Sequence, residues 1–177
     1  MISKVIAIDD RYAQRRAKEA GLKHFPVRKF IDLVNSGDGV DVLECLVTVI
    51  KRVPENETAE AIATVERNTT RSQHALEMQG ATVIICPSKK SSSSPNGFKM
   101  SDDQRLMIAT LSTCLKLRPR YLVFVGGDGD YSSMIAELRK EGIRTEVVAH
   151  PSNRASDLER VAFALIDIEK VFEKIKK

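Results

Sequence analysis

Aspartates follow two short apolar runs that are typical of buried strands. Asp9 comes directly after the run 5–8, while Asp128 and Asp130 follow the run 121–125 through a pair of glycines. Parallel strands end at the same edge of a sheet, and open α/β sheets form their clefts at that edge, so these acids are expected to meet in one cleft. Carboxylates gathered in a cleft resist ionising together unless a cation, usually a divalent one, lies among them. The sequence therefore predicts a metal site built from acids that are far apart along the chain.

The turn that carries the second pair of acids suits close contact with a ligand. Gly126, Gly127 and Gly129 allow the backbone to turn sharply and to approach a bound group closely. No histidine or cysteine stands beside the acids, and all-oxygen ligand sets are typical of hard cations. Mg²⁺ or Mn²⁺ is therefore the expected ion.

A locally basic segment follows Asp9. Only Glu19 opposes the basic residues of this segment, which are Arg11, Arg15, Arg16, Lys18, Lys23, Arg28 and Lys29. The whole chain carries 28 lysines and arginines against 24 acids, a net charge of +4, which favours an anionic partner. The alternative is that these residues form only the solvated face of a helix, as charge runs usually do.

Composition is typical of one soluble globular domain spanning residues 1–177. The chain is 42% hydrophobic and 29% charged, with no internal repeat. Its three cysteines, Cys45, Cys86 and Cys114, are odd in number and far apart, which argues against disulfides and zinc and favours a reducing, cytoplasmic location. The apolar run before Asp9 is too short for a signal peptide, and no stretch approaches membrane-spanning length. No membrane partner is expected.

Apolar runs alternate with helical patterns along the chain, which predicts a mostly parallel sheet with helices on both faces. For the two acidic strand ends to be neighbours, the strand order must reverse at the first strand. The prediction is a three-layer α/β/α fold with a five-stranded sheet in the order 3-2-1-4-5. The strands are expected at 3–9, 40–53, 81–86, 121–128 and 143–149, and helices are expected to start near 26, 58, 101, 132 and 156.

Three further segments bear on organisation and on the site. The serine-rich stretch 88–98 is predicted to be a mobile surface loop. Ser101 and Gln104 form a capping box pattern, which places Asp102 in the first turn of a helix, where an acid also favours the helix dipole without any catalytic role. Residues 156–177 are predicted to form one C-terminal helix whose apolar face packs on the core, with a homodimer contact as the alternative.

Three motifs together resemble the NYN domains, the LabA-like branch of the PIN-domain nucleases. They are Ile-Ala-Ile-Asp9, Lys99-Met-Ser-Asp102 at a helix start, and Gly126-Gly-Asp-Gly-Asp-Tyr131, and the resemblance covers residues 3–150. It implies a compact α/β nuclease fold of the PIN-like class, an acidic cluster that binds Mg²⁺ or Mn²⁺, and hydrolysis of RNA phosphodiesters. Carried over residue by residue, the catalytic and metal-binding residues become Asp9, Asp102, Asp128 and Asp130.

The function expected from these features is metal-assisted hydrolysis of RNA. A held ion lowers the pKa of a bound water and stabilises charge on the attacked phosphate. Sequence-independent phosphate contacts are expected from the basic residues Arg11, Arg15, Arg16, Lys18 and Lys99. Aromatic residues make up only 5% of the chain, which argues against extensive base stacking.

Two alternatives compete with the nuclease. The first is an RNA-binding or regulatory module of the same fold, because Tyr12 stands where family members usually have an asparagine, and positions 107–109 lack the further acid that many members carry. The second is a haloacid-dehalogenase-like phosphohydrolase, which needs an acid two residues after its nucleophilic aspartate. Arg11 occupies that position after Asp9 and removes the general acid.

Overall fold

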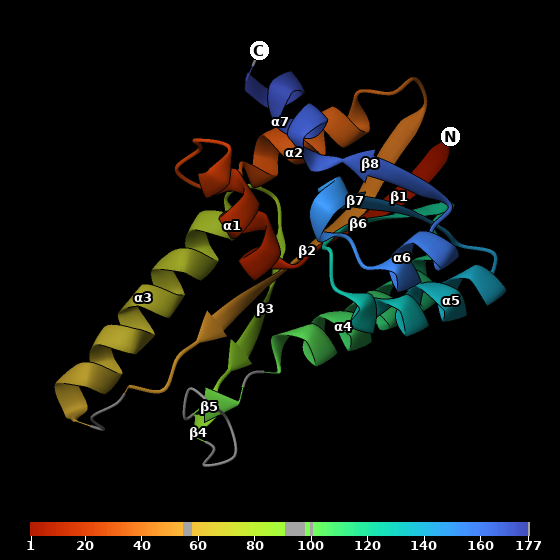
Figure 1. Ribbon diagram of the computed structural model, residues 1–177. Helices are drawn as coiled ribbons and strands as arrows, with labels where there is room; N and C mark the ends of the chain where they lie inside the picture. Colours follow the sequence, from red (N-terminus) through yellow and green to blue (C-terminus); the bar gives the residue numbers. More distant parts are fainter. Residues whose placement is uncertain (55–57, 91–97, 100, 177) are drawn as a thin grey trace.

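The computed structural model describes residues 1–54, 58–90, 98–99 and 101–176, and it has a parallel sheet at its centre (Figure 1). The strands of this sheet are β1 (Ile2–Ile8), β2 (Val40–Lys51), β3 (Thr82–Pro87), β6 (Tyr121–Val125), β7 (Arg144–Ala149) and β8 (Ala164–Asp167). The helices are α1 (Asp10–Glu19), α2 (Val27–Asn35), α3 (Ala59–Glu77), α4 (Asp102–Leu117), α5 (Ser132–Lys140), α6 (Ser156–Val161) and α7 (Ile168–Lys176). Two 3-10 turns, η1 (Gly129–Tyr131) and η2 (Pro151–Asn153), and a short antiparallel pair, β4 (Lys89–Lys90) and β5 (Phe98–Lys99), complete the described elements.

The strand order confirms the predicted reversal at the first strand. The six strands are arranged β3-β2-β1-β6-β7-β8, and all of their pairings are parallel. Strand β1 is central, since Ala7 is opposite Leu46 of β2 on one side and Phe124 of β6 on the other. The predicted order 3-2-1-4-5 is therefore correct, because its fourth and fifth strands are β6 and β7. The structure adds one further strand, β8, beside β7.

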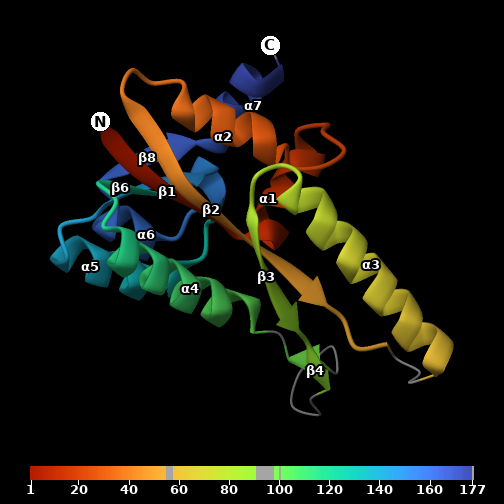
Figure 2. The same ribbon diagram turned by 180° about the vertical axis from the view of Figure 1, so that it is seen from behind.

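Helices cover both faces of the sheet and make the predicted three layers. Helices α1, α2, α3 and α7 lie on one face and α4, α5 and α6 on the other (Figures 1 and 2). Because both faces are covered, the central strand has no polar side, and Val5, Ile6, Ala7 and Ile8 are all fully buried. No helix in the described part of the chain is long and apolar enough to cross a membrane.

The segment 156–177 does not form the single helix predicted for it. It is divided into α6, β8 and α7, and the strand pairs with β7 from Glu146 opposite Ala164 to Ala149 opposite Asp167. The apolar residues of a four-residue strand fit a helical pattern equally well, and only pairing with β7 decides between them. This pairing supplies the sixth strand.

Two other local predictions were wrong. The basic segment after Asp9 contains a helix, α1, with buried positions Tyr12, Ala13, Arg16 and Ala17 on one face, where the prediction placed the first helix only near position 26. The side chain of Ser101 makes no capping hydrogen bond at the start of α4. The predicted loop 88–98 lies mostly at positions 91–97, outside the described residues.

Candidate functional site

The carboxyl ends of β1 and β6 lie side by side, as the strand order requires. The backbone N–H of Asp9 donates a hydrogen bond of 2.9 Å to the carbonyl of Val125, so the ladder between the two strands continues to their last residues. The chain then turns into α1 after Asp9, and into η1 through Gly126, Gly127 and Asp128. The two acidic strand ends therefore border the same part of the sheet edge.

Gly126 and Gly127 are required by close packing at this turn. A Cβ atom on Gly126 would lie 2.6 Å from the Phe124 ring, and one on Gly127 would lie 2.3 Å from the carbonyl oxygen of Asn153. The Gly127 carbonyl also accepts a hydrogen bond of 3.0 Å from the backbone N–H of Ala155. These contacts fix the path of the backbone that leads to Asp128.

Asp9 is a buried acid at the start of α1. Its residue is 7% exposed, and its carboxylate accepts a hydrogen bond of 3.2 Å from the backbone N–H of Tyr12, which caps the helix. Burial raises the pKa of Asp9 to about 6, and the negative charges of Asp103 and Asp102 add to this rise, while the Tyr12 N–H and the Arg11 guanidinium oppose it. Asp9 is therefore a weaker acid than an exposed aspartate and lies near two other acids.

Arg11 supplies a positive charge to the acids at the start of α4. Its Nε lies 2.9 Å from Oδ2 of Asp102, and its Nη2 lies 3.6 Å from Oδ2 of Asp103. The Asp102 side chain is only 2% exposed, and its other oxygen, Oδ1, is buried with no hydrogen-bond partner among the described residues. Asp102 thus has one carboxylate oxygen paired with a guanidinium and one buried oxygen for which the described part of the chain supplies no partner.

Asp103 belongs to the same acidic group, although the sequence prediction did not include it. Its carboxylate accepts a hydrogen bond of 2.8 Å from the hydroxyl of Tyr131. Burial raises the pKa of Asp103, and the charges of Asp102 and Asp128 add to this rise, while the Tyr131 hydrogen bond and Arg11 lower it. Asp103 therefore interacts through its charge both with Asp102 of α4 and with Asp128.

The two acids of the turn after β6 lie in different places. Asp128 is exposed, lines the hollow described below, and accepts a hydrogen bond of 3.0 Å from the backbone N–H of Asp130. Asp130 is also exposed but does not line the hollow. Asp9 and Asp128 thus line one hollow, the charges of Asp102 and Asp103 act on Asp9, and Asp130 is not among the residues that line the hollow.

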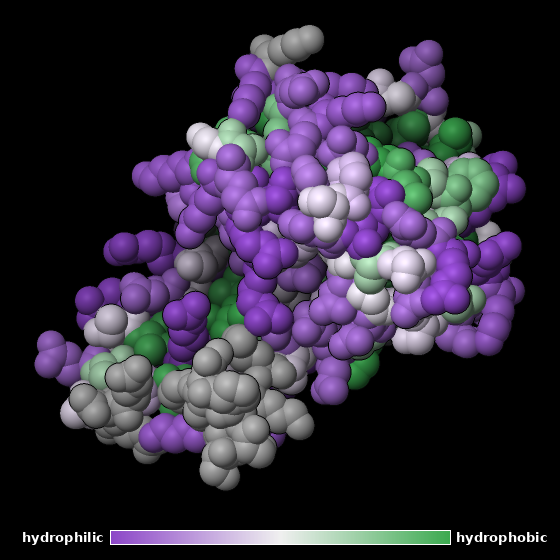
Figure 3. Space-filling model, viewed as in Figure 1, coloured by the Kyte–Doolittle hydropathy of each residue, from purple (hydrophilic) through white to green (hydrophobic). Residues whose placement is uncertain are grey.

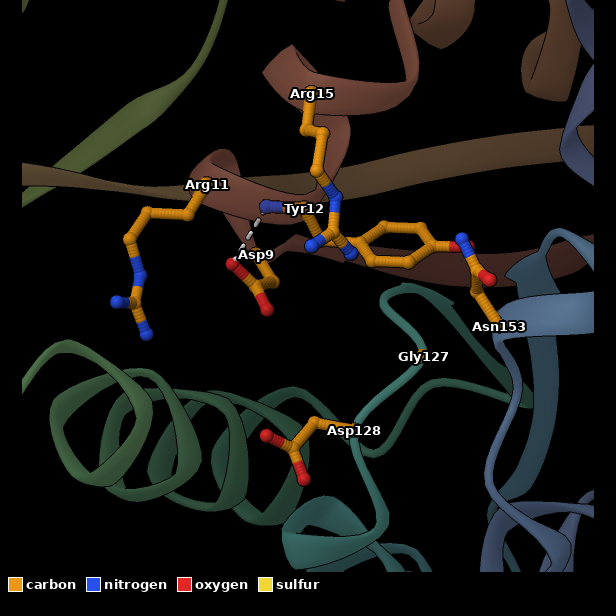
Figure 4. Close-up of a pocket in the computed structure, with 7 residues that line it drawn as sticks. All are labelled: Asp9, Arg11, Tyr12, Arg15, Gly127, Asp128 and Asn153. Carbon is orange, nitrogen blue, oxygen red and sulfur yellow. Dashed lines mark hydrogen bonds between the residues drawn. The ribbon is translucent and has the colours of Figure 1, made fainter.

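An open hollow of about 460 Å³ lies between α1 and the turn after β6. Its lining combines two acids, two guanidinium groups and uncharged residues: Asp9, Asp128, Arg11, Arg15, Tyr12, Gly127 and Asn153. Figure 4 shows Asp9 and Asp128 facing the same opening, with Arg11 to one side and Asn153 beyond the Tyr12 ring on the other. The hollow therefore presents both carboxylates and guanidinium groups to a ligand that enters it.

The basic residues predicted to contact RNA are divided between the hollow and the rest of α1. Arg15 lines the hollow, with its guanidinium 5.7 Å from the centre of the Tyr12 ring. Arg16 is buried and pairs with Glu19 and with Glu169, the latter at 2.6 Å, so it ties α1 to α7 and is not available to a ligand. Lys18 is exposed and lies outside the hollow. The side chain of Lys99 lies outside the described residues.

Sequence reasoning did not identify Asp103, Tyr131 or Asn153 as site residues. Asp103 could have been found from its position next to Asp102, because both acids lie in the first turn of the same helix. Asn153 follows β7, which ends beside β6, so a search for polar residues after every neighbouring strand end would have found it. Tyr131 is the last residue of the Gly-Asp-Gly-Asp-Tyr turn and points back to Asp103.

The residues present fit a hard divalent cation in chemistry. The donors are carboxylates from three chain segments, and Asp102 offers a buried oxygen that no described residue engages. In the side-chain positions of the described residues, however, no three acidic, histidine or cysteine groups stand close enough to hold one ion. The guanidinium of Arg11 provides the positive charge among the acids instead.

The parallel sheet with helices on both faces, and with acids at its carboxyl edge, defines a PIN-like α/β domain. The chain belongs to the NYN domain family, whose model matches residues 9–169, and this family is part of the PIN-like nuclease superfamily. A crystal structure of a protein of unknown function from Vibrio parahaemolyticus has a similar fold, with a TM-score of 0.67 and 16% sequence identity over 95% of this chain and 94% of that chain. No curated protein sequence matches the chain.

Proposed function

We propose that this NYN domain, of the LabA-like branch, is a metal-dependent ribonuclease that hydrolyses RNA phosphodiester bonds. The observation that supports the proposal is the meeting of acids from three chain segments at one sheet edge. Asp9 follows β1, Asp102 begins α4, and Asp128 follows β6. Burial raises the pKa values of Asp9 and Asp103, and neighbouring carboxylates add to both rises: Asp103 and Asp102 for Asp9, and Asp102 and Asp128 for Asp103. A bound cation would relieve this repulsion.

The ion proposed is Mg²⁺ or Mn²⁺, held by Asp9, Asp102 and Asp128 with Asp103 beside them. A divalent ion bound there supplies a water of lowered pKa and positive charge for the attacked phosphate. Arg11 pairs with Asp102, and release of that pair would free its guanidinium for a phosphate oxygen. Arg15 would hold the adjacent phosphate at the rim of the hollow.

The test is cleavage of an end-labelled single-stranded RNA by the purified chain, with Mn²⁺, with Mg²⁺ and with chelator. We expect metal-dependent products, and a loss of at least about a hundredfold in rate for Asp128→Asn, because the ion loses a charged ligand. The matched control is Asp32→Asn, which changes an exposed carboxylate of α2 that pairs with Arg28. Cleavage that survives both chelator and Asp128→Asn would exclude the proposed mechanism.

A second candidate is a module of the same fold that binds RNA without cleaving it. The observation that favours it is the pairing of Arg11 with Asp102 and Asp103, which places a positive charge among the acids without any ion. Calorimetric titration with Mn²⁺ separates the two candidates, because a nuclease must take up the ion at the acidic group. An RNA-binding module would retain its RNA affinity in chelator and give no heat with Mn²⁺.

A further inference from the structure

A cluster of stacked aromatic and guanidinium side chains lies at the amino ends of the strands, away from the acidic group. The rings of Tyr121 and Phe163 meet edge to face, with their centres 5.7 Å apart. The guanidinium carbon of Arg144 lies 4.9 Å from the centre of the Phe163 ring and 5.9 Å from the centre of the Tyr121 ring. The backbone N–H of Phe163 donates to the carbonyl of Thr145, which holds the residue at the beginning of β8. We call Arg120, Tyr121, Arg144 and Phe163 the aromatic edge cluster.

The phenol group of Tyr121 lies between two guanidinium groups. Arg144 donates a hydrogen bond of 3.2 Å to the Tyr121 hydroxyl. Hydrogen bonds from Arg144 and from Arg120 lower the pKa of Tyr121, and the positive charges of the same two residues add to this effect. Two guanidinium groups thus converge on one neutral oxygen at the surface.

The charges around the aromatic edge cluster do not cancel. Lys4 pairs with Glu146 at 2.7 Å, and Arg118 pairs with Glu141 at 2.7 Å, so these four residues are neutral as pairs. Within the described residues, the ion pairs of this edge include neither Arg120 nor Arg144, and both side chains are exposed. The positive charges of these two exposed guanidinium groups are therefore not balanced by an acid of the described residues, which favours an anionic partner.

Phe163 adds an apolar contact surface to this positive charge. It is 56% exposed, although a phenylalanine gains free energy when it is buried. Hydrophobic side chains gather on the side of the molecule where β8 begins, with hydrophilic residues around them (Figure 3). A half-exposed ring beside two guanidinium groups that no acid of the described residues pairs with matches a nucleotide, which has a base to stack and a phosphate to bind.

We propose that the aromatic edge cluster is a second contact site for single-stranded RNA, in which a base stacks on Phe163 and a phosphate binds Arg120 and Arg144. This site is not part of the acidic hollow, since none of its residues lines it. It uses no metal ion and does not require that the chain cleaves RNA. A strand held here would increase the local concentration of RNA at the domain, whether the acidic group is catalytic or not.

A second copy of the chain is the other occupant that the exposed apolar residues suggest. Three apolar residues that the structure describes in this region are exposed. Phe163, directly before the edge strand β8, is 56% exposed, Leu165 in β8 is 41% exposed, and Ile2 at the start of β1 is 36% exposed. A two-fold interface would, however, place the same positively charged patch on both of the facing surfaces. The uncompensated charge of the cluster therefore favours a polyanion over self-association.

The absence of tryptophan from the chain provides a direct probe of this site. Phe163→Trp would introduce the only tryptophan in the protein, at the position proposed to stack with a base. We expect a short oligouridylate to quench its fluorescence in a saturable and salt-dependent way, in chelator and in an Asp128→Asn background that prevents cleavage. Introducing Arg144→Gln or Arg120→Gln into this variant should weaken the affinity about tenfold.

The matched control for lost charge is Arg67→Gln, which removes an exposed arginine of α3 on a distant part of the molecule (Figure 1). It should change the affinity of the tryptophan variant less than about threefold, as expected for a weak long-range charge effect. Phe163→Ala, measured by anisotropy of the labelled RNA, should weaken binding about tenfold or more. Circular dichroism would verify that these variants retain the fold.

Several results would overturn the proposal. RNA binding by anisotropy without quenching of the introduced tryptophan would place the RNA elsewhere, and equal quenching by uridine monophosphate alone would identify a free nucleotide as the ligand. Sedimentation that shows dimers lost in Phe163→Ala would identify the cluster as a contact between copies. Metal-dependent cleavage is scored separately with the wild-type chain, so failure of either proposal is recognised independently of the other.

Discussion

Arg11 and Asp102 form an ion pair across two helices, with Nε and Oδ2 2.9 Å apart, in the middle of the acidic group. The Arg11 side chain is 48% exposed, whereas Asp102 is 2% exposed. A buried carboxylate needs a positive partner, and a half-exposed guanidinium is a partner that can leave toward solvent or toward a phosphate. The pair thus supplies one positive charge to the acidic group and leaves Oδ1 of Asp102 without a partner among the described residues.

Arg11→Gln should make the protein less stable without metal and more responsive to metal. Loss of the guanidinium leaves Asp102 and Asp103 without their cation. In chelator we expect the free energy of unfolding to fall by about 1 to 2 kcal/mol. The effect is modest because solvent partly screens the charge of the half-exposed arginine. Mn²⁺ should then raise the melting temperature of the variant more than that of the wild type, because the ion no longer competes with Arg11. Arg28→Gln, at an exposed pair with Asp32, is the control. Equal shifts with Mn²⁺ in Arg11→Gln and wild type would show that Arg11 and the ion do not compete.

The stability of the metal-free protein should fall as the pH rises from about 4 to about 6. The pKa of Asp9 is raised from 3.8 to about 6 in the folded state, so the folded chain binds a proton that the unfolded chain has already lost. This stabilisation is complete below the unfolded value and is lost as the pH passes the folded value. A rise of about 2 in the pKa corresponds to about 3 kcal/mol.

Asp9→Asn should remove part of this pH dependence, since an amide oxygen can still accept the Tyr12 N–H and carries no charge. Part should remain, because the pKa values of Asp10 and Asp103 are also raised by burial. Urea unfolding at pH 4, 5, 6 and 7 in chelator measures the effect. A variant with the same slope as the wild type would show that Asp9 is not its source.

Strand-level features of the site were predictable from the sequence because they depend on strand order alone. The apolar runs before Asp9 and Asp128 identified two strands, and the reversal at the first strand made them neighbours. The NYN motifs identified the family that the comparison confirms. What sequence reasoning could establish was which acids share a sheet edge.

Side-chain partners could not be predicted in the same way. The pairing of Arg11 with Asp102 joins α1 to α4, and nothing in the spacing of the two residues indicates it. The burial of Arg16 was accessible in principle, since Tyr12, Ala13, Arg16 and Ala17 follow the helical spacing of a buried face. The aromatic edge cluster was missed because a low aromatic content says nothing about where the few rings gather.

Asp103→Asn should impair the proposed cleavage more than Asp130→Asn does. Asp103 contacts Arg11 and Tyr131 and raises the pKa of Asp9, whereas Asp130 lies outside the hollow. We expect Asp130→Asn to retain a cleavage rate within about threefold of the wild type. Asp103→Asn should lower the cleavage rate about tenfold, which is typical when a residue that supports the metal ligands is lost. The reverse ranking would make Asp130 a ligand of the ion together with Asp9, Asp102 and Asp128, as the resemblance to the NYN motifs implied.

Gly127→Ala should destabilise the fold by more than about 2 kcal/mol, because the new Cβ would lie 2.3 Å from the Asn153 carbonyl oxygen and 2.9 Å from the Tyr12 ring. The new methyl group would clash with the Asn153 backbone on one side and the packed Tyr12 ring on the other, and neither can move away at low cost. Gly129→Ala is the matched control in the same turn, since its Cβ would meet side chains rather than backbone, the nearest being Ala155 at 3.2 Å. Urea unfolding of both variants measures the difference. If the Gly127 variant were as stable as the Gly129 variant, η2 would not pack on this turn, and Asn153 would not belong to the hollow.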